Sequence, residues 1–277
     1  MLLRVGYRRC FASAVHAQTE SVTYFLADAC HGVGFSLAKS ILIKSPLTRL
    51  AAATQSTACA QEFKNALWDG DRLITSSFDL TDQRQLENFV SRANYSLGDD
   101  VQVLLLNVGE LPSRWQREFL TTPLIGDTIA SEWIRLCKDV AAVGILLKTI
   151  LPSMMAAPTL IGRRKVVAIF SHQSPLPLHV NAVAFKVANA ALDELVRSTS
   201  IELARNAAQS EFVAVKVSTP IGLADRGSQL EWCTEVSKQI DRLRKDESFA
   251  LQYNGRSLPI PGYPAQIDTF GYDSNVI

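Results

Sequence analysis

Short apolar runs alternate with stretches of helical spacing along almost the whole chain after residue 20. The run VTYFLA (22–27) precedes GFSLAKSILIKS (34–45), in which apolar residues recur about every three or four positions. The most apolar run is VQVLLLN (101–107), and KVVAIFS (165–171) and FVAVKVS (212–218) also have helical stretches beside them. Strands separated by helices of about 10 to 15 residues indicate βαβ units and a parallel sheet. The pattern therefore predicts a single α/β domain with a doubly wound, Rossmann-like parallel sheet.

Length and composition agree with one such domain. The chain has 277 residues, of which 47% are hydrophobic, so it can bury a full core. Its formal net charge is +1, without the clustered basic residues of a nucleic-acid-binding surface. No stretch reaches the roughly 18 uninterrupted apolar residues of a membrane span, because even VAAVGILL ends at Lys148. We expect neither direct nucleic-acid binding nor a membrane span.

The first 19 residues have a composition of their own. They contain Arg4, Arg8 and Arg9, and no acidic residue occurs before Glu20. A basic, acid-free segment with serine, alanine and leucine is typical of a mitochondrial transit peptide, and the alternative is a frayed basic N-terminus. We expect residues 1–19 to be a transit peptide, residues 20–250 to be the folded domain, and the protein to lie in the mitochondrial matrix or on the matrix side of the inner membrane.

The last 27 residues, 251–277, are rich in proline and aromatic residues. Three prolines in the stretch 259–264 disfavour a helix or a central strand there. Tyr263, Phe270 and Tyr272 are unusual in a solvated tail. We expect an extended C-terminal tail that packs either on its own domain or on a neighbouring protein.

The five cysteines are Cys10, Cys30, Cys59, Cys137 and Cys233. They are scattered, odd in number and without a CxxC pair, which favours reduced thiols in packed positions over a disulfide framework or a zinc site. We expect no metal site.

Six short motifs occur in the order LADACHGVGFSLAK, FDLTD, LLLNVG, AIFS, AFKVANAALDEL and VSTP. Over about residues 22–222, with these motifs at these spacings, the chain resembles the short-chain dehydrogenase/reductase family. The resemblance implies a Rossmann-like fold, an NAD(P) cofactor and carbonyl reduction. Fold alone does not establish function, so the individual positions decide how much of this carries over.

In that family, a turn of the form T-G-x-x-x-G-x-G after the first strand approaches the cofactor pyrophosphate at a helix N-terminus. The matching residues here are Ala27, Asp28, Gly32 and Gly34. Two unit charges about 5 Å apart repel by about 3 kcal/mol at an effective dielectric of 20, so Asp28 beside a phosphate predicts weak cofactor binding. The other interpretation, which we favour, is that the carboxylate accepts hydrogen bonds from free N–H groups at the helix start and fills the phosphate's electrostatic role.

The second strand ends in AAATQS, where Thr54 and Gln55 specify neither NAD nor NADP. Three further family positions are retained as Asp79, Asn107 and Gly109. With Gly32 and Gly34 they are the candidate cofactor-binding residues, and they are also compatible with purely structural turn and capping roles.

Catalysis in the family uses a tyrosine that donates the proton, a lysine one helical turn later, a serine that polarises the carbonyl, and an asparagine on the preceding long helix. Ser171 matches the serine. Phe185 and Asn189 fall at the tyrosine and lysine positions, and Ala141 falls at the asparagine position. Phenylalanine cannot donate a proton, and a general acid contributes about 10² to 10⁴ in rate. No catalytic set is intact.

Substitutes for the missing groups are few. Lys186 is adjacent to Phe185 but points about 100° away around the helix. His172 and His179 lie in the loop after Ser171, where a histidine is more often structural than catalytic. The family's Pro-Gly after the sixth strand is Pro220-Ile221 here.

Three functions remain open at this point. The main interpretation is a non-catalytic relative that serves as a structural or assembly subunit of a larger mitochondrial complex, such as the ribosome or a respiratory complex, or as a homo-oligomer, and that needs no cofactor. The alternative is an NAD(P)-dependent oxidoreductase with an atypical active site, weak cofactor binding and a carbonyl substrate. A nucleotide-sensing module without turnover lies between them.

Overall fold

The computed structural model describes residues 21–30, 33–67, 70–98, 100–107, 127–159, 162–172, 182–206, 211–220, 223 and 225–263, without the side chains of 127–136, 139, 172 and 182–186. The expected transit peptide, residues 1–19, lies outside these ranges and stays a prediction.

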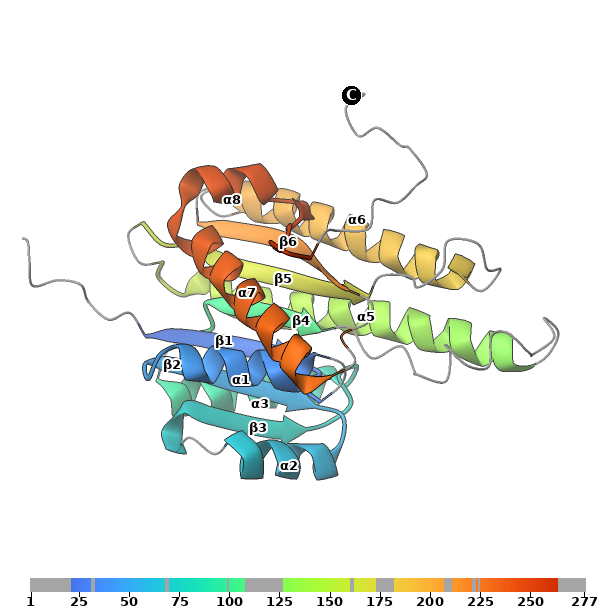
Figure 1. The fold of residues 1–277 in the computed structure, drawn as a ribbon, viewed down its shortest axis with the longest axis horizontal. Helices are drawn as coiled ribbons and strands as arrows, with labels where there is room; N and C mark the ends of the chain where they lie inside the picture. Colours follow the sequence, from blue (N-terminus) through green and yellow to red (C-terminus); the bar gives the residue numbers. More distant parts are fainter. Residues whose placement is uncertain are drawn as a thin grey trace, which may run out of the picture.

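Seven parallel strands form one sheet in the order β3-β2-β1-β4-β5-β6-β7 (Figure 1). The strands are β1 (Val22–Ala27), β2 (Thr48–Thr54), β3 (Leu73–Ser77), β4 (Val103–Asn107), β5 (Lys165–His172), β6 (Phe212–Thr219) and β7 (Arg256–Ser257). Strands β1 and β4 are buried along their whole length, because helices cover both faces of a parallel sheet. This confirms the predicted doubly wound parallel sheet.

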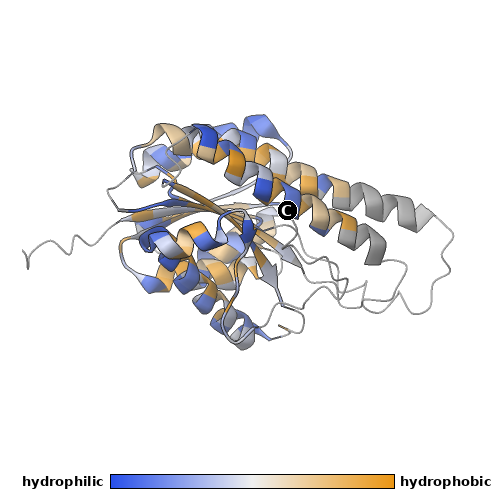
Figure 2. Cartoon of the chain, turned by 90° about the horizontal axis from the view of Figure 1, so that it is seen from above, coloured by the Kyte–Doolittle hydropathy of each residue, from blue (hydrophilic) through white to orange (hydrophobic). Residues whose placement is uncertain are grey.

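Helices cover the two faces of the sheet in two layers (Figure 2). The first layer holds α1 (Gly34–Lys44), α2 (Thr57–Leu67), α7 (Arg226–Lys245) and α8 (Glu247–Tyr253). The second holds α3 (Gln83–Leu97), α5 (Asp127–Ala156) and α6 (Ala182–Asn206). A short 3₁₀ turn, η1 (Gly70–Arg72), precedes β3. Each layer packs its apolar stripe on one face of the sheet, as amphipathic helices do.

The end of α5 shows how one buried cation holds a helix in place. Lys165, at the start of β5, is 2% exposed. Its Nζ donates hydrogen bonds to the carbonyl oxygens of Met154 and Ala157 at the end of α5, with the Met154 bond 2.6 Å long. Burial holds the pKa of Lys165 below its ordinary value. The ammonium group therefore closes the C-terminus of α5, where cations are favoured.

The folded domain extends past residue 250, where the sequence predicted its end. Helix α8 runs to Tyr253, and β7 adds a short strand at the edge of the sheet. Leu258 and Ile260 are both buried in the first apolar layer. The described part of the expected tail, up to residue 263, thus belongs to the folded domain. Burial of the two apolar side chains that follow β7 holds it there. Residues 264–277 lie outside the described ranges.

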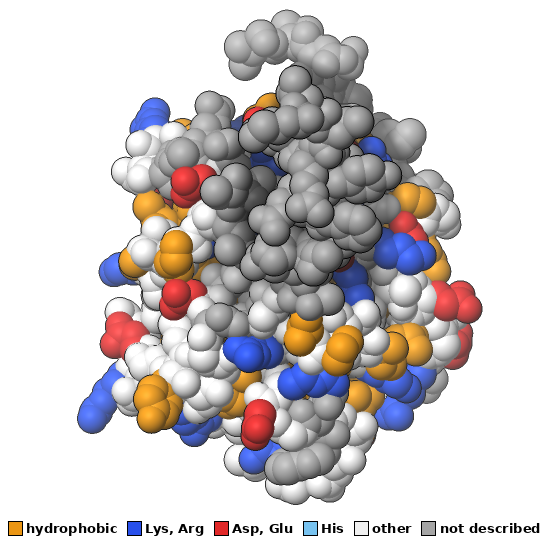
Figure 3. Space-filling model, turned by 90° about the vertical axis from the view of Figure 1, so that its left-hand side faces the viewer, with side chains coloured by type: hydrophobic (Ala, Val, Ile, Leu, Met, Phe, Trp, Pro, Cys, Tyr) orange, Lys and Arg blue, Asp and Glu red, His pale blue; other side chains and the backbone are white. Residues whose placement is uncertain are grey.

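Charges of both signs are interspersed with apolar side chains on the face that Figure 3 shows. That face carries no single-sign patch among its described residues. Among the residues that the structure describes, no helix is both long enough and apolar enough to cross a bilayer.

Candidate functional site

The strand order reverses at β1, which has β2 on one side and β4 on the other. In doubly wound sheets, ligands bind in the crevice at the carboxyl ends of the strands at such a reversal. The turn after β1 and the ends of β2, β4, β5 and β6 all belong to this edge of the sheet (Figure 1). Gly34, Asn107 and Ser171, three of the predicted site residues, lie along it.

Gly34 opens α1 directly against the turn that precedes it. A Cβ atom at this position would lie 2.7 Å from the Asp28 carbonyl oxygen and 2.7 Å from the Ala29 carbonyl carbon. Those are backbone atoms, so they cannot move aside as a flexible side chain could. The absence of a side chain lets α1 start close to the end of β1, which is the role of the last glycine in a dinucleotide-binding turn. On this observation, the turn fits a dinucleotide.

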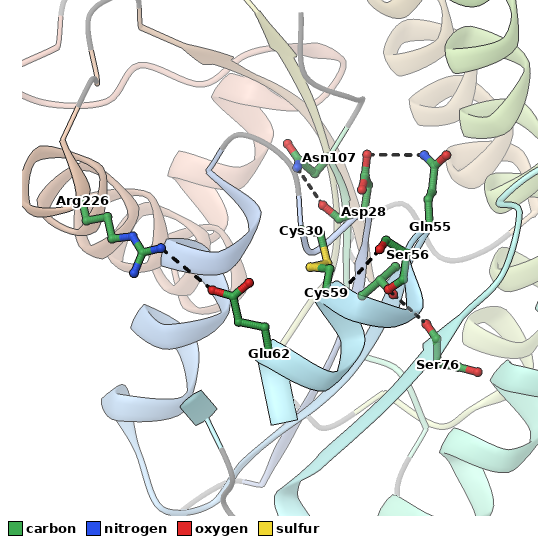
Figure 4. Close-up of a disulfide and its surroundings, with 10 residues drawn as sticks. Asp28, Cys30, Gln55, Ser56, Cys59, Glu62, Ser76, Asn107 and Arg226 are labelled. Carbon is green, nitrogen blue, oxygen red and sulfur yellow. Dashed lines mark hydrogen bonds and ion pairs between the residues drawn. A yellow bond between two sulfur atoms is a disulfide. The ribbon is translucent and has the colours of Figure 1, made fainter. Parts of the chain in front are cut away.

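Asp28 adopts a left-handed backbone conformation, with φ 52°, at the position where dinucleotide-binding turns have their first glycine. Aspartate tolerates this conformation better than most residues, at a cost of about 1 kcal/mol. The residue is 1% exposed, and its carboxylate accepts a hydrogen bond from Nε2 of Gln55 at 3.4 Å (Figure 4). The N-cap of α1 is Val33, and no side-chain hydrogen bond caps this helix within the described residues. The predicted capping role of the carboxylate stays a prediction, and one of its hydrogen bonds runs to Gln55, directly after β2.

Asn107 ties β4 to the same turn. Its Nδ2 donates a hydrogen bond to the carbonyl oxygen of Asp28 at 2.9 Å, and the side chain is 4% exposed (Figure 4). The backbone N–H of Ala29 bonds the carbonyl oxygen of Ala53 at 2.9 Å, so the turn is held from both neighbouring strands. The first two residues of the turn, Asp28 and Ala29, are consequently fixed to the strands on both sides.

The two polar side chains at the end of β2 have different partners. The hydroxyl of Thr54 is buried and donates to the carbonyl oxygens of Ser56 and Ser76. Gln55 is exposed and bonds Asp28. Of these two residues, only Gln55 offers polar atoms to a ligand at this end of the strand.

Asp79, retained from the family pattern, forms a turn. Its Oδ1 accepts hydrogen bonds from the backbone N–H and the hydroxyl of Thr81, at 2.9 and 2.7 Å, and these bonds lower the pKa of the carboxyl group. Asp82 rather than Asp79 is the N-cap of α3. The structural interpretation of Asp79 thus has direct support, and the residue is exposed after the end of β3.

The four positions equivalent to the family's catalytic residues are placed as follows. Ser171 lies on β5, 2% exposed, next to Ser218 of β6 in the strand register. Phe185 and Asn189 lie one helical turn apart on α6, and Asn189 is partly buried. Ala141 is exposed on α5. The side chain of Phe185 is outside the described set, so its direction stays a prediction.

Several predicted positions fall outside the described residues: Gly32, Gly109, His179 and Ile221. The same holds for the side chains of His172 and Lys186.

A disulfide bond joins Cys30, in the turn after β1, to Cys59, in the first part of α2, with their Cα atoms 6.0 Å apart (Figure 4). This corrects the expectation of separate reduced thiols for these two residues. The other described cysteines, Cys137 and Cys233, are free thiols. No spacing signal marks this pair, because the residues are 29 positions apart and meet only through the βαβ crossover.

Thr219 is a second residue that the sequence does not single out. It ends β6 beside His172 and is 6% exposed. Its hydroxyl has no hydrogen-bond partner within the described part of the chain. A buried hydroxyl without a partner is uncommon and adds an available polar group to this edge of the sheet.

An open hollow of about 470 Å³ lies elsewhere, between the ends of α1 and α2 and the turn η1, lined by Lys39, Ile43 and Arg72 among others. It is at the opposite edge of the sheet, where the strands begin. Neither the residues of the turn after β1 nor Ser171 lines this hollow, so it is separate from the candidate site.

No protein-family model matches the chain, and neither does any curated protein sequence. Solved structures do match. A short-chain oxidoreductase from Pseudomonas aeruginosa PAO1, described as NADPH-bound and as containing an atypical catalytic center, superposes with a TM-score of 0.64 at 17% identity, over 89% of this chain and 97% of that one.

Two further structures give the same result. A glucose/ribitol dehydrogenase of the short-chain dehydrogenase/reductase type from Brucella melitensis has a TM-score of 0.62 at 17% identity, covering 89% of this chain and 98% of that one. A short-chain dehydrogenase/reductase family oxidoreductase from Burkholderia thailandensis has a TM-score of 0.60 at 22% identity, covering 87% and 92%. The chain therefore has the fold of the short-chain dehydrogenases/reductases over nearly its whole described length.

Proposed function

We propose that the protein is an NAD(P)-dependent oxidoreductase that binds its cofactor at the carboxyl edge of the sheet and reduces a carbonyl group with an atypical active site. The observation that carries the proposal is Gly34, whose missing side chain lets α1 begin against the backbone of Asp28 and Ala29. The Asn107 bond to the same turn supports it. Dinucleotide-binding turns use a glycine at this position for the same close packing of helix on strand.

The Asp28 carboxylate does not oppose this proposal as strongly as the sequence suggested. It points toward Gln55 and the end of β2, which is the ribose side of the crevice in such folds. A carboxylate there is compatible with ribose hydroxyls and unfavourable for a 2′-phosphate. We therefore expect NAD to be preferred over NADP.

The chemistry of the site rests on Ser171. A bound nicotinamide supplies the hydride in enzymes of this fold. The Ser171 hydroxyl is the retained group for polarising the carbonyl oxygen. Phe185 cannot donate the proton, so we assign that role to water or to a side chain outside the described residues. The NADPH-bound structure with an atypical catalytic center supports this by showing that the fold accommodates such sites.

Thermal stability in the presence of each nicotinamide cofactor tests binding. A ligand at a hundredfold over its dissociation constant adds about 2.7 kcal/mol, which is a shift of several degrees for a domain of this size. We expect a shift with NAD or NADH. No shift with any of the four cofactors at millimolar concentration would remove the proposal.

Hydride transfer across a panel of carbonyl substrates tests turnover. Replacing Ser171 with alanine should lower kcat/KM by about 10² while leaving the cofactor shift intact, because loss of one oxyanion donor typically costs 10² to 10³. Ser237→Ala is the matched control: Ser237 is a buried serine on α7 that bonds Ser40, away from the crevice. Equal rates for the Ser171 variant and the wild type would assign the chemistry elsewhere.

A second function is favoured by a separate observation, the phenylalanine and asparagine on α6 at the positions of the family's acid and lysine. That observation favours, as a second candidate function, a non-catalytic subunit of a mitochondrial complex. Purification of the tagged full-length chain from mitochondria followed by size measurement tests it. Recovery in a large assembly, with no cofactor shift, supports this second function, and recovery as a free monomer or small homo-oligomer counts against it.

A further inference from the structure

We propose that Cys30 and Cys59 are a reversible thiol pair whose oxidation closes the ribose side of the cofactor crevice and weakens dinucleotide binding. The proposal rests on the proposed function, since it concerns regulation of the same site. It goes beyond that function because it identifies a modification site at two residues with no part in hydride transfer.

The location of the bond is the first reason. Cys30 lies between Asp28 and Gly34 in the turn that follows β1, and Cys59 lies near the amino end of α2, which follows β2. The bond therefore spans the gap between the ends of the adjacent strands β1 and β2, next to the strand-order reversal between β1 and β4 (Figure 4). In doubly wound folds, the adenosine ribose binds across this gap.

A second link crosses the same gap. The hydrogen bond from Gln55 to the Asp28 carboxylate joins the turn after β1 to the residue after β2, alongside the disulfide (Figure 4). With both links formed, the turn and the start of α2 are held together. Separation of these segments thus requires a broken S–S bond, whereas the 3.4 Å hydrogen bond from Gln55 can exchange with water.

The weak attachment of α2 is the third reason. Of its 11 residues, only Ala60 and Phe63 are buried. By comparison, α1 has the same length and buries seven residues. Because few side chains hold α2 on the sheet, its amino end can shift away from the turn once the covalent bond is cut. Helices with few buried contacts are the elements that open at low cost.

Access to redox reagents is the fourth reason. Cys30 and Cys59 are both partly exposed, so a small thiol can attack the bond. Cys233 contrasts with them: it is fully buried in the core, where burial raises the pKa of its thiol far above the ordinary value. Cys233 is consequently inert, and the two partly exposed residues are the pair that responds.

The reaction is a thiol–disulfide exchange with a small-molecule disulfide such as oxidised glutathione. One cysteine thiolate attacks a sulfur of the small disulfide, forming a mixed disulfide and releasing one small thiolate. The second cysteine thiolate then attacks the protein sulfur of that mixed disulfide and releases the second small thiolate. The protein loses two electrons and two protons, the small disulfide gains them, and excess small thiol reverses both steps.

The test compares dinucleotide affinity in the two redox states of the full chain. The protein is incubated with oxidised glutathione or with a dithiol reductant, and alkylation followed by peptide mass mapping measures the Cys30–Cys59 link. Calorimetric titration with NADH then gives the dissociation constant of each form. We expect the reduced form to bind about tenfold more tightly, a coupling within the usual range between two linked events.

Two variants complete the test. Cys59→Ser cannot form the link, so its affinity should equal that of the reduced wild type after either treatment. Cys137→Ser removes an exposed cysteine on α5 and should keep the full redox difference. Circular dichroism checks that both variants are folded.

Reciprocal coupling gives a readout that does not involve the affinity measurement. Because a ligand that prefers the reduced form stabilises it, saturating NADH should raise the reduction potential of the pair. A tenfold difference in affinity corresponds to about 30 mV for this two-electron couple. Glutathione redox buffers with and without NADH measure the shift.

The outcomes separate this proposal from the proposed function. Complete interconversion of the link with equal NADH affinity in both forms would overturn the thiol proposal and leave cofactor binding intact. A redox difference that persists in Cys59→Ser would overturn it too. Absence of binding in both forms, with all four cofactors, removes the proposed function and the thiol proposal together.

Discussion

At the scale of single residues, Asp28 sets the turn after β1 apart from the glycine-rich turns that bind dinucleotides. It occupies a left-handed conformation in place of glycine and turns its carboxylate toward Gln55. Both features belong to one residue, an aspartate at a position where dinucleotide-binding turns have glycine, and they have separate consequences. The backbone conformation affects stability, whereas the charge affects the choice of cofactor.

Replacing Asp28 with asparagine should raise affinity for NADPH relative to NADH. Asparagine tolerates the same backbone conformation and keeps a side-chain oxygen but removes the negative charge. A unit charge about 5 Å from a 2′-phosphate costs about 3 kcal/mol at an effective dielectric of 20, so the affinity ratio should change by roughly a hundredfold. Parallel titrations with the two cofactors measure it. An unchanged ratio would show that the carboxylate does not face the ribose.

Gly34 permits an equally direct prediction about stability. In Gly34→Ala, the new Cβ would lie 2.7 Å from two backbone atoms, so the turn or α1 must shift, at a cost of about 1 to 3 kcal/mol. Gly144→Ala on α5 is the control, because its Cβ meets nothing within 4 Å and alanine is the better helix former by about 0.5 to 1 kcal/mol. Urea unfolding measures both. Similar stabilities for the two variants would contradict the close approach at Gly34.

At the scale of elements, three helices begin with the same device. The carboxylates of Asp82, Asp225 and Asp246 accept backbone N–H hydrogen bonds at the starts of α3, α7 and α8. The backbone bond lowers the pKa of Asp246, and bonds from Gln85 and Ser228 lower those of Asp82 and Asp225. Helix α1 differs, with an apolar N-cap residue and no side-chain cap within the described residues, so its start relies on packing.

These caps predict acid sensitivity. A carboxyl group whose folded pKa is lowered contributes stability above its unfolded pKa of 3.8, and that contribution is lost as the pH falls through the folded value. The triple Asp→Asn variant at these positions should be less stable than wild type near neutral pH, and the difference should shrink below about pH 4. Urea midpoints across this range measure it, with Asp71→Asn as the control at an exposed aspartate that caps no helix.

Long helices also show where sequence reasoning reaches its limit at this scale. The motif AFKVANAALDEL covers only the first half of α6, which extends from Ala182 to Asn206, and the apolar run VAAVGILL covers only part of α5, which extends from Asp127 to Ala156. Helix α5 even continues through Pro152. Packing of α5 against α6 and the sheet, together with the Lys165 bonds at its end, favours helix where local propensity alone would stop it.

At the scale of the whole molecule, two apolar layers share one sheet. Leu37 of α1 belongs to one layer and Phe89 of α3 to the other, and both are buried. Both layers pack against the same strands, one on each face of the sheet. Loss of packing on either face therefore lowers the stability of the whole domain.

Leu37→Ala and Phe89→Ala should each lower the free energy of unfolding by about 2 to 5 kcal/mol. They should do so within one cooperative transition, since neither layer has a sheet of its own. Urea unfolding followed by circular dichroism, with hydrogen exchange of peptides from β1 and β4, measures this. A variant in which only one layer loses protection would show that the two faces unfold separately.

The fold and the backbone frame of the site could be predicted from the chain itself. Periodicity of apolar residues follows from the geometry of strands and helices, so it indicated the βαβ order and placed Gly34, Asn107 and Ser171 at strand and helix ends. The extension of the domain to β7 was missed, because a two-residue edge strand has no period to detect.

Only the tertiary structure decided which side chains come into contact at the carboxyl edge of the sheet. Three contacts depend on the two crossovers that bring separate segments together: the pairing of Cys30 with Cys59, the hydrogen bond between Gln55 and Asp28, and the bond from Thr54 to the Ser76 carbonyl oxygen. Local sequence carries periodicity because each residue's neighbours set the backbone geometry. It carries no record of contacts between segments 27 or 29 residues apart, which form only when the sheet is assembled.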